Sequence, residues 1–98
     1  MVSMFKMTLN HLNGMWFTRD NKCSMWIGDD FHKKIEIICD RNIIVSEDIR
    51  FEYLDQQNIY KLSNSVLLYQ IFDDNSIRIR VSHNDETIDW DFDRRKRR

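Results

Sequence analysis

Apolar and polar residues alternate along most of the chain, with the period of two that half-buried β-strands show. Short clusters of Asp and Asn separate the alternating runs, and these residues form tight turns where glycine is scarce. The pattern predicts strands over residues 14–19, 23–28, 31–39, 42–46, 48–54, 58–62, 66–72, 76–82 and 86–93, with 42–46 and 48–54 also compatible with one bent strand. We therefore expect an all-β fold, an antiparallel up-and-down meander of about eight strands that closes into a small barrel.

One segment, residues 46–61, also fits a helix, because Ser46–Asp48 resembles a helix N-cap. Apolar residues nevertheless alternate with charged ones between positions 49 and 53, so a strand is the better prediction. A helix over residues 46–56 would instead favour a five-stranded oligonucleotide-binding barrel, which is the alternative fold.

The last hairpin has a register that both faces support. A two-residue turn at Asn84–Asp85 aligns five cross-strand pairs: Val81 with Ile88, Arg80 with Asp89, Ile79 with Trp90, Arg78 with Asp91 and Ile77 with Phe92. One face is apolar and the other pairs Arg with Asp, whereas a shift by one residue would oppose apolar and charged side chains throughout.

The first hairpins place apolar side chains on the outside of the sheet. A turn at Asp20–Asn21 sets Met15 opposite Trp26 and leaves Phe17 on the same outward face, with His32 next along. Aromatic residues and Met are enriched at interface centres, so Met15, Phe17, Trp26 and His32 are the candidate partner-binding residues. Alternatively, residues 1–12 fold back over this face and make it a satellite core.

The two cysteines are expected to be reduced. A three-residue turn at residues 28–30 sets Cys23 opposite Ile35, which leaves Cys39 about 13 Å from Cys23 along the neighbouring strand. Bridged cysteines have Cα atoms within about 7 Å of each other, so this register excludes a disulfide. Cys23, His32 and Cys39 match no zinc-ligand spacing, and we expect neither a metal nor a cofactor.

Composition indicates a packed, soluble protein. The chain is 42% hydrophobic, 32% charged and 12% aromatic, and no run of apolar residues is long enough to cross a membrane. We see no signal peptide at the N-terminus. Together with reduced cysteines, these features predict a cytoplasmic protein without membrane association.

The charge distribution divides the chain into an acidic body and a basic tail. Residues 1–93 hold ten basic and sixteen acidic residues, a formal charge of −6, and the last five residues are all basic. We expect a single barrel domain over residues 1–93 and a tail of Arg94, Arg95, Lys96, Arg97 and Arg98. An acidic body disfavours nucleic-acid binding, although the tail alone could contact nucleic acid or an acidic partner, or could simply be a solvated end.

The segment Gly14-Met15-Trp16 resembles the Gly-x-Trp start of the lipocalin and calycin barrels. In that family the Trp closes the bottom of the barrel and packs on a basic residue near the end of the last strand, and the resemblance implies this role for Arg94 or Arg95. It therefore implies a lipocalin-like barrel. An eight-stranded barrel either holds a small ligand or is filled by side chains, and we expect filling by six aromatic residues, Trp16, Phe31, Tyr53, Tyr69, Trp90 and Phe92.

The sequence provides no set of catalytic residues. The three histidines lack a Ser or Cys at motif spacing, and the acidic row of β-strand residues 89–93 faces Arg78 and Arg80. We expect a non-enzymatic protein that inhibits or regulates a macromolecular partner, either another protein or a second copy. The alternatives are a carrier of a small hydrophobic ligand and a nucleic-acid binder that uses the tail. The absence of Ala and Pro indicates an AT-rich gene, which fits a phage or mobile element.

Overall fold

The computed structural model describes residues 9–29, 31–54 and 59–94, and within them nine antiparallel strands form one sheet. Successive strands pair with each other except β4 and β5, and β1 also pairs with β9, so the predicted meander is confirmed. The elements are η2 (Leu9–His11), β1 (Gly14–Phe17), β2 (Cys23–Ile27), β3 (Lys34–Cys39), β4 (Asn42–Asp48), β5 (Glu52–Leu54), β6 (Ile59–Lys61), β7 (Val66–Asp73), β8 (Ser76–His83) and β9 (Glu86–Asp93).

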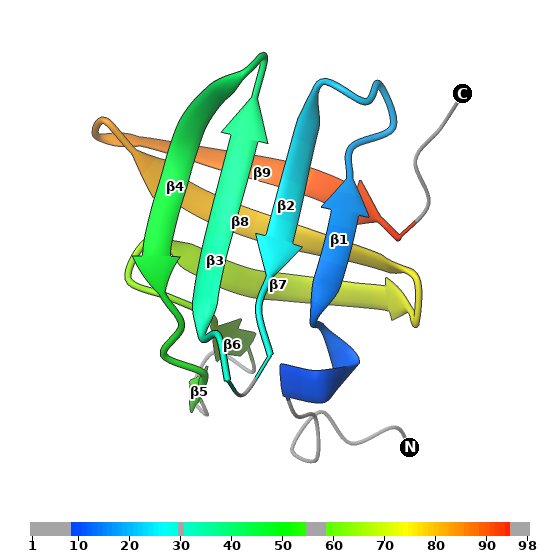
Figure 1. The fold of residues 1–98 in the computed structure, drawn as a ribbon, viewed down its shortest axis with the longest axis vertical. Helices are drawn as coiled ribbons and strands as arrows, with labels where there is room; N and C mark the ends of the chain where they lie inside the picture. Colours follow the sequence, from blue (N-terminus) through cyan, green and yellow to red (C-terminus); the bar gives the residue numbers. More distant parts are fainter. Residues whose placement is uncertain (1–8, 30, 55–58, 95–98) are drawn as a thin grey trace.

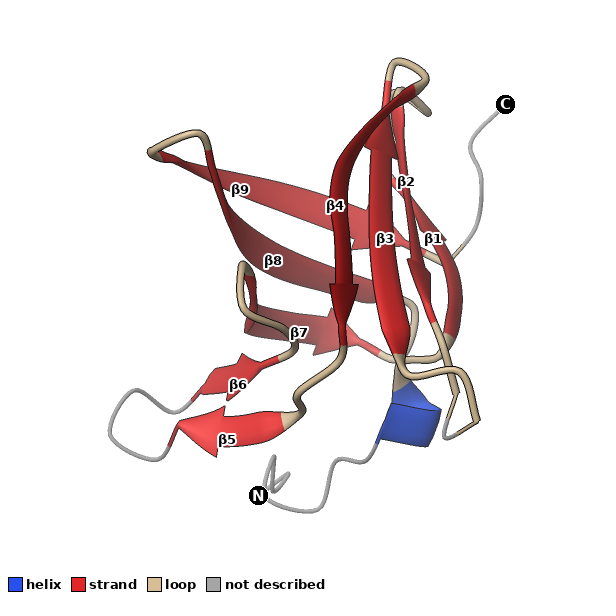
Figure 2. Cartoon of the chain, turned by 60° about the vertical axis from the view of Figure 1, so that its left-hand side comes forward, coloured by secondary structure: helices blue, strands red, loops and turns tan. Residues whose placement is uncertain are grey.

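The sheet curls strongly on itself. Strands β1 to β4 form one layer, and β7, β8 and β9 cross behind it (Figure 1). The sheet order is β4-β3-β2-β1-β9-β8-β7-β6-β5, so β4 and β5 are its two edges and do not pair with each other. The prediction of a closed barrel is therefore wrong in its closure: the fold is an open half-barrel (Figure 2).

The link between β4 and β5 bonds to both halves of the curled sheet. The backbone N–H of Ile49 donates to the carbonyl of Lys33, and the N–H of Arg50 donates to the carbonyl of Leu62. These bonds hold the link extended where a helix would satisfy its own backbone groups. Residues 46–54 accordingly contain the end of β4 and all of β5, and not the helix that the alternative fold requires.

A carboxylate on β4 also ties this strand to the connection between β6 and β7. Glu47 accepts hydrogen bonds from the hydroxyls of Ser63 and Ser65, at 2.7 and 2.5 Å, and from the backbone N–H of Ser65 at 2.9 Å. Burial raises the pKa of Glu47, but the hydrogen bonds from the two serines together lower it by more. The pKa of Glu47 therefore lies below its ordinary value. Glu47 thus supplies by its side chain a link that strand pairing does not make.

Side chains fill the space between the two layers. Trp16 is 1% exposed, and its indole Nε1 donates to the carbonyl of Leu12 at 2.8 Å. Around it lie fully buried residues from both layers: Met25, Ile27, Ile35, Ile37, Leu68, Ile77, Ile79 and Phe92. Two of the six aromatics expected in the interior are instead exposed, because Phe31 lies in the loop after β2 and Tyr69 faces outward from β7.

The β8–β9 hairpin has the predicted register at all five pairs. Asn84 and Asp85 form its turn with φ values of 50° and 63°, the left-handed conformation that a two-residue turn of this kind requires at both positions. The Arg and Asp side chains of this hairpin form two ion pairs, with Arg78 Nε 2.7 Å from Asp91 and Arg80 Nε 2.8 Å from Asp89.

The β2–β3 register differs from the predicted one by four residues, and this corrects the cysteine prediction. Ile27 rather than Cys23 lies opposite Ile35, so Cys23 lies opposite Cys39 with a Cα separation of 4.1 Å. The two cysteines form a disulfide. The loop is longer than expected because the carboxylate of Asp29 accepts hydrogen bonds from the backbone N–H groups of residues 31 and 32 and extends the turn.

The disulfide removes one argument for a cytoplasmic location, because that argument assumed reduced thiols. In the part of the chain that the structure describes, no helix has the length and apolarity needed to cross a membrane.

Candidate interaction surface

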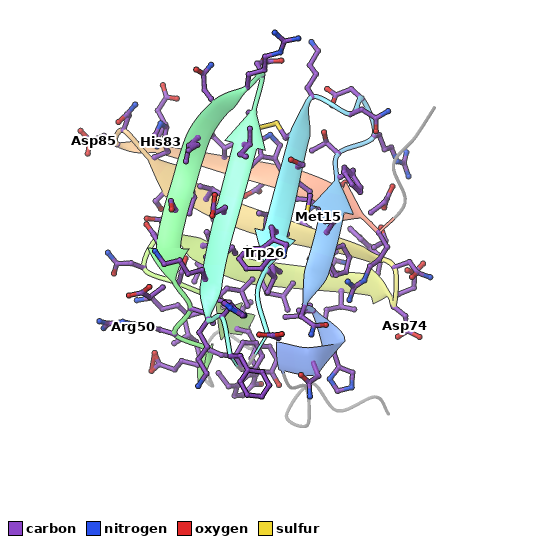
Figure 3. The ribbon with its side chains drawn as sticks, viewed as in Figure 1. Met15, Trp26, Arg50, Asp74, His83 and Asp85 are labelled. Atoms are coloured by element: carbon purple, nitrogen blue, oxygen red, sulfur yellow. A yellow bond between two sulfur atoms is a disulfide. The ribbon has the colours of Figure 1, made fainter. Side chains whose placement is uncertain are left out.

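Met15 and Trp26 lie side by side on the outward face of β1 and β2. They are cross-strand partners, whereas the next pair, Trp16 and Met25, points inward and is buried. Met15 is 42% exposed and Trp26 is half-buried. Both side chains are on the near side of the β1–β4 layer in Figure 3. The predicted outward placement of Met15, Phe17 and Trp26 is confirmed.

The apolar surface continues across the other two strands of the layer. Phe17 pairs with Ser24, Ser24 with Ile38, and Ile38 with Ile43, so these residues form one row from β1 to β4. Ile38 is 36% exposed and Ile43 is 63% exposed. We call the set Met15, Phe17, Trp26, Ile38 and Ile43 the outer apolar face.

A β-bulge brings Ile43 onto this face. The β3–β4 register shifts between Ile37 and Ile38, so that Ile37 pairs with Val45 while Ile38 pairs with Ile43. Ile44 is the extra residue, and it packs partly against the core. Next to the row lies an open groove of about 420 Å³, lined by Phe17, Asn21, Lys22, Ser24, Ile38, Asp40 and Arg41.

His32 lies in the loop between β2 and β3 and not on a strand as predicted. Its imidazole is 77% exposed, and Nδ1 lies 3.5 Å from the carboxylate of Asp29. The carbonyl oxygen of His32 packs against Gly28 so closely that a Cβ at Gly28 would lie 1.7 Å from it and 3.1 Å from the Trp26 ring. The backbone of His32 therefore borders Trp26, while its side chain is directed to solvent and to Asp29.

Arg94, the first residue of the predicted basic tail, belongs to the folded body. Its guanidinium carbon lies 4.0 Å from the centroid of the Trp16 ring, and Nη2 donates to the carbonyl of His11 at 2.6 Å. Burial lowers the pKa of Arg94. Residues 95–98 lie outside the described part of the chain, so the tail prediction concerns Arg95, Lys96, Arg97 and Arg98 alone.

A second surface, on the outer side of β7, β8 and β9, is charged and aromatic. Arg80 lies between the Asp89 carboxylate and the Tyr69 ring, with 4.1 Å from its guanidinium carbon to the ring centroid. Hydrogen bonds from the Arg80 guanidinium hold the pKa of Asp89 below its ordinary value. Asp89 and Asp91 thus each form an ion pair with an arginine of β8.

Cys23, His32 and Cys39 do not converge on a metal site, because the two cysteines are bonded to each other and His32 lies in the loop at the far end of β2. Among the described residues, no group of three or more His, Cys, Asp or Glu side chains is arranged to hold a metal ion. No protein-family model, curated protein or solved structure matches this chain.

Proposed function

We propose that this chain is a non-catalytic binding protein that inhibits or regulates a protein partner, and that the outer apolar face is its docking surface. The observation that carries the proposal is the exposure of Met15, Ile38 and Ile43 on one side of a layer whose other side already forms the core. Burying apolar surface contributes about 25 cal/mol per Å², so this face gains stability when a partner covers it.

The residue types on the face support an interface. Trp, Phe and Met are enriched where partners bury each other most deeply, and a few such anchors dominate binding energy. Trp26 lies on the inner strand β2 between Met15 and the β3 side chains, which is a central position on the layer. A central, half-buried Trp with Met15 and Glu36 as its cross-strand neighbours fits an anchor residue that a partner would cover.

We further propose that the chain is related to the small lipocalin-like barrels. The Arg94–Trp16 stack supports this relationship, because it is the contact that the Gly-x-Trp resemblance implies. The binding roles of such barrels agree with a non-catalytic function. An origin in a phage or mobile element remains part of the proposal and rests on composition alone.

The test is capture of partners from a lysate of the source cells on three immobilised proteins: the natural chain, Trp26→Ala and Asp74→Asn. Asp74 is exposed in the β7–β8 turn, away from the face, and serves as the matched surface control (Figure 3). We expect a protein retained by the natural chain and by Asp74→Asn but lost with Trp26→Ala. Retention of the same proteins by all three would refute the assignment of this face.

Sedimentation of the purified chain separates a foreign partner from a second copy. If the chain forms dimers that Trp26→Ala dissociates, the face is a homodimer interface. If the natural chain and Trp26→Ala both sediment as monomers, the outer apolar face binds the captured partner protein.

A further inference from the structure

Strand β9 has an edge that the fold leaves without a neighbouring strand. It is eight residues long, but in the described part of the chain it pairs with β1 only at Phe17 and Asp93. β1 ends there because the chain turns back toward β2: Asn21 has φ of 59°, and its N–H donates to the carbonyl of Thr18. Among the described residues, no strand therefore occupies the position alongside β9 that a longer β1 would fill, and we call it the vacant position.

The register defines which backbone groups face this position. The N–H of Arg94 donates to the carbonyl of Asn75, so even-numbered residues of the last strand direct their backbone groups toward β8. In an antiparallel ladder alternate residues bond to opposite sides. The backbone N–H and C=O groups of Thr87, Asp89 and Asp91 therefore point away from β8, into the vacant position. Unpaired strand edges of this kind are templates for another strand.

A groove lies beside this edge. It measures about 360 Å³ and lies between β9 and the β1–β2 turn, lined by Thr18, Arg19, Asp20, Cys23, Arg78, Asp89, Trp90 and Asp91. Trp90 is half-buried and belongs to the apolar side of β9. Toward its turn, the β8–β9 hairpin projects beyond the β1–β4 layer, which leaves that part of the edge accessible (Figure 2).

The edge is acidic on its outer side. The outer side of β9 carries Asp89, Asp91 and Asp93 and no basic residue, and Asp89 and Asp91 are paired with arginines of β8. Opposite charges across neighbouring strands stabilise a sheet, and like charges destabilise it. A strand with Lys or Arg on its outer side would extend the Arg–Asp alternation of β8 and β9 by one strand. A second copy of β9 would instead bring acidic residues together.

We propose that the free edge of β9 binds an extended segment of a protein partner by strand addition, and that this segment alternates apolar and basic residues. Its apolar side chains would pack in the groove against Trp90, and its basic side chains would lie beside Asp89 and Asp91. Main-chain hydrogen bonds supply affinity in this mode of recognition, and alternate side chains supply specificity. The site shares no residue with the outer apolar face.

The probe is a blocked octapeptide that alternates valine and arginine, titrated into the isotope-labelled chain. The readout is the indole N–H resonance of Trp90, assigned by its loss in Trp90→Phe. We expect a saturable shift of this resonance. In one control peptide, the backbone N–H groups that point to one edge of the extended peptide are methylated. In another, the arginines are replaced by glutamates. Each change should weaken binding at least tenfold. Methylation tests backbone pairing without altering the protein.

Two substitutions at one exposed position complete the test. Thr87→Pro removes an N–H that points into the vacant position, and Thr87→Lys adds a charge that repels the basic peptide while sparing the fold. Each should weaken binding at least tenfold, whereas Trp26→Ala should leave it within twofold, which separates this proposal from the function of the outer apolar face.

Three results of the peptide titration would overturn the proposal. These are no shift of the Trp90 resonance at millimolar peptide, equal binding of the methylated peptide, or equal binding of the glutamate peptide. Dimers of the chain that Thr87→Pro dissociates would also overturn it, since they would assign the edge to a second copy.

Discussion

Arg94 stacks on Trp16 and so fastens the end of the last strand to the start of the first. The guanidinium carbon lies 4.0 Å from the ring centroid, while Nη1 and Nη2 donate to the carbonyls of Asn13 and His11. The same contact explains Gly14, where an added Cβ would lie 3.1 Å from Nη1 and where φ is +111°. Among the described residues, β1 and β9 are paired at one position, Phe17 with Asp93, so the Arg94 side chain adds contacts that strand pairing does not supply there.

Arg94→Ala should therefore lower the free energy of unfolding by about 2 kcal/mol, because it removes a cation–π contact and two charge-assisted hydrogen bonds. Urea denaturation followed by tryptophan fluorescence measures this loss. Arg98→Ala removes the same charge and is the control, expected to stay within about 0.5 kcal/mol of the natural chain. Equal stability of all three proteins would show that the stack contributes nothing.

Glu47 should make stability depend on pH. The hydrogen bonds from Ser63 and Ser65 lower its pKa below the ordinary 4.5, so its stabilisation is present above that value and is lost as pH falls through the lower folded pKa. We expect Glu47→Gln to cost about 1 kcal/mol near neutral pH and progressively less as the pH falls below the ordinary pKa of 4.5. Thermal melts at a series of pH values test this. A difference from the natural chain that is constant with pH would contradict it.

The Cys23–Cys39 disulfide should contribute to stability through the chain segment that it closes. The cysteines are 16 positions apart, and a loop of that size gives a stabilisation of about 3 kcal/mol in the chain-entropy model. Reductant should lower the melting temperature of the natural chain and have no effect on the Cys23→Ser/Cys39→Ser double variant. If thiol titration of the unfolded natural chain without reductant finds two free thiols, the bond is absent in solution.

The disulfide also shows what the sequence could and could not predict. The predicted and observed β2–β3 registers differ by four residues, and an even shift leaves every side chain on its predicted face. The inward and outward assignments of Met25 and Trp26 were therefore right, while the partner of Cys23 was wrong. Loop length decided the partner, and it depends on the Asp29 side chain, which no period of two reveals.

The candidate surface was predictable to a similar depth. Alternation and a tight turn were enough to place Met15 beside Trp26. Ile43 joins them only because a bulge between Ile37 and Ile38 adds a residue to β4, and a bulge has no signature in this sequence. The prediction of a closed barrel was wrong for a related reason. Pairing of β4 with β5 depends on the geometry of the three-residue link between them, and the alternation within either strand does not reveal that geometry.

Replacement by alanine should cost much more stability at Trp16 than at Trp26. Trp16 is buried in the core and Trp26 lies on the outer face, so Trp16→Ala should cost about 3 to 5 kcal/mol and Trp26→Ala less than about 1.5 kcal/mol. Partner binding should weaken by about 2 kcal/mol with Trp26→Ala, as expected of an interface anchor. Unfolding of Trp26→Ala under conditions where the natural chain is folded would assign Trp26 to the core.

The β8–β9 turn should be improved by glycine at its second position. Asp85 has φ of 63°, a left-handed conformation that strains any residue with a Cβ and suits glycine, whereas Asp74 in the β7–β8 turn is not among the residues with positive φ. Asp85→Gly should raise the free energy of unfolding by about 0.5 kcal/mol, since relief of strain exceeds the added freedom of the unfolded chain.

Asp74→Gly removes the same charge and gains no such relief, so it should lower stability by about 0.5 to 1 kcal/mol. Both residues lie in exposed turns at the ends of long hairpins, so urea melts compare them directly (Figure 3). If the two substitutions shift stability in the same direction, the backbone conformation of Asp85 is not what limits this turn.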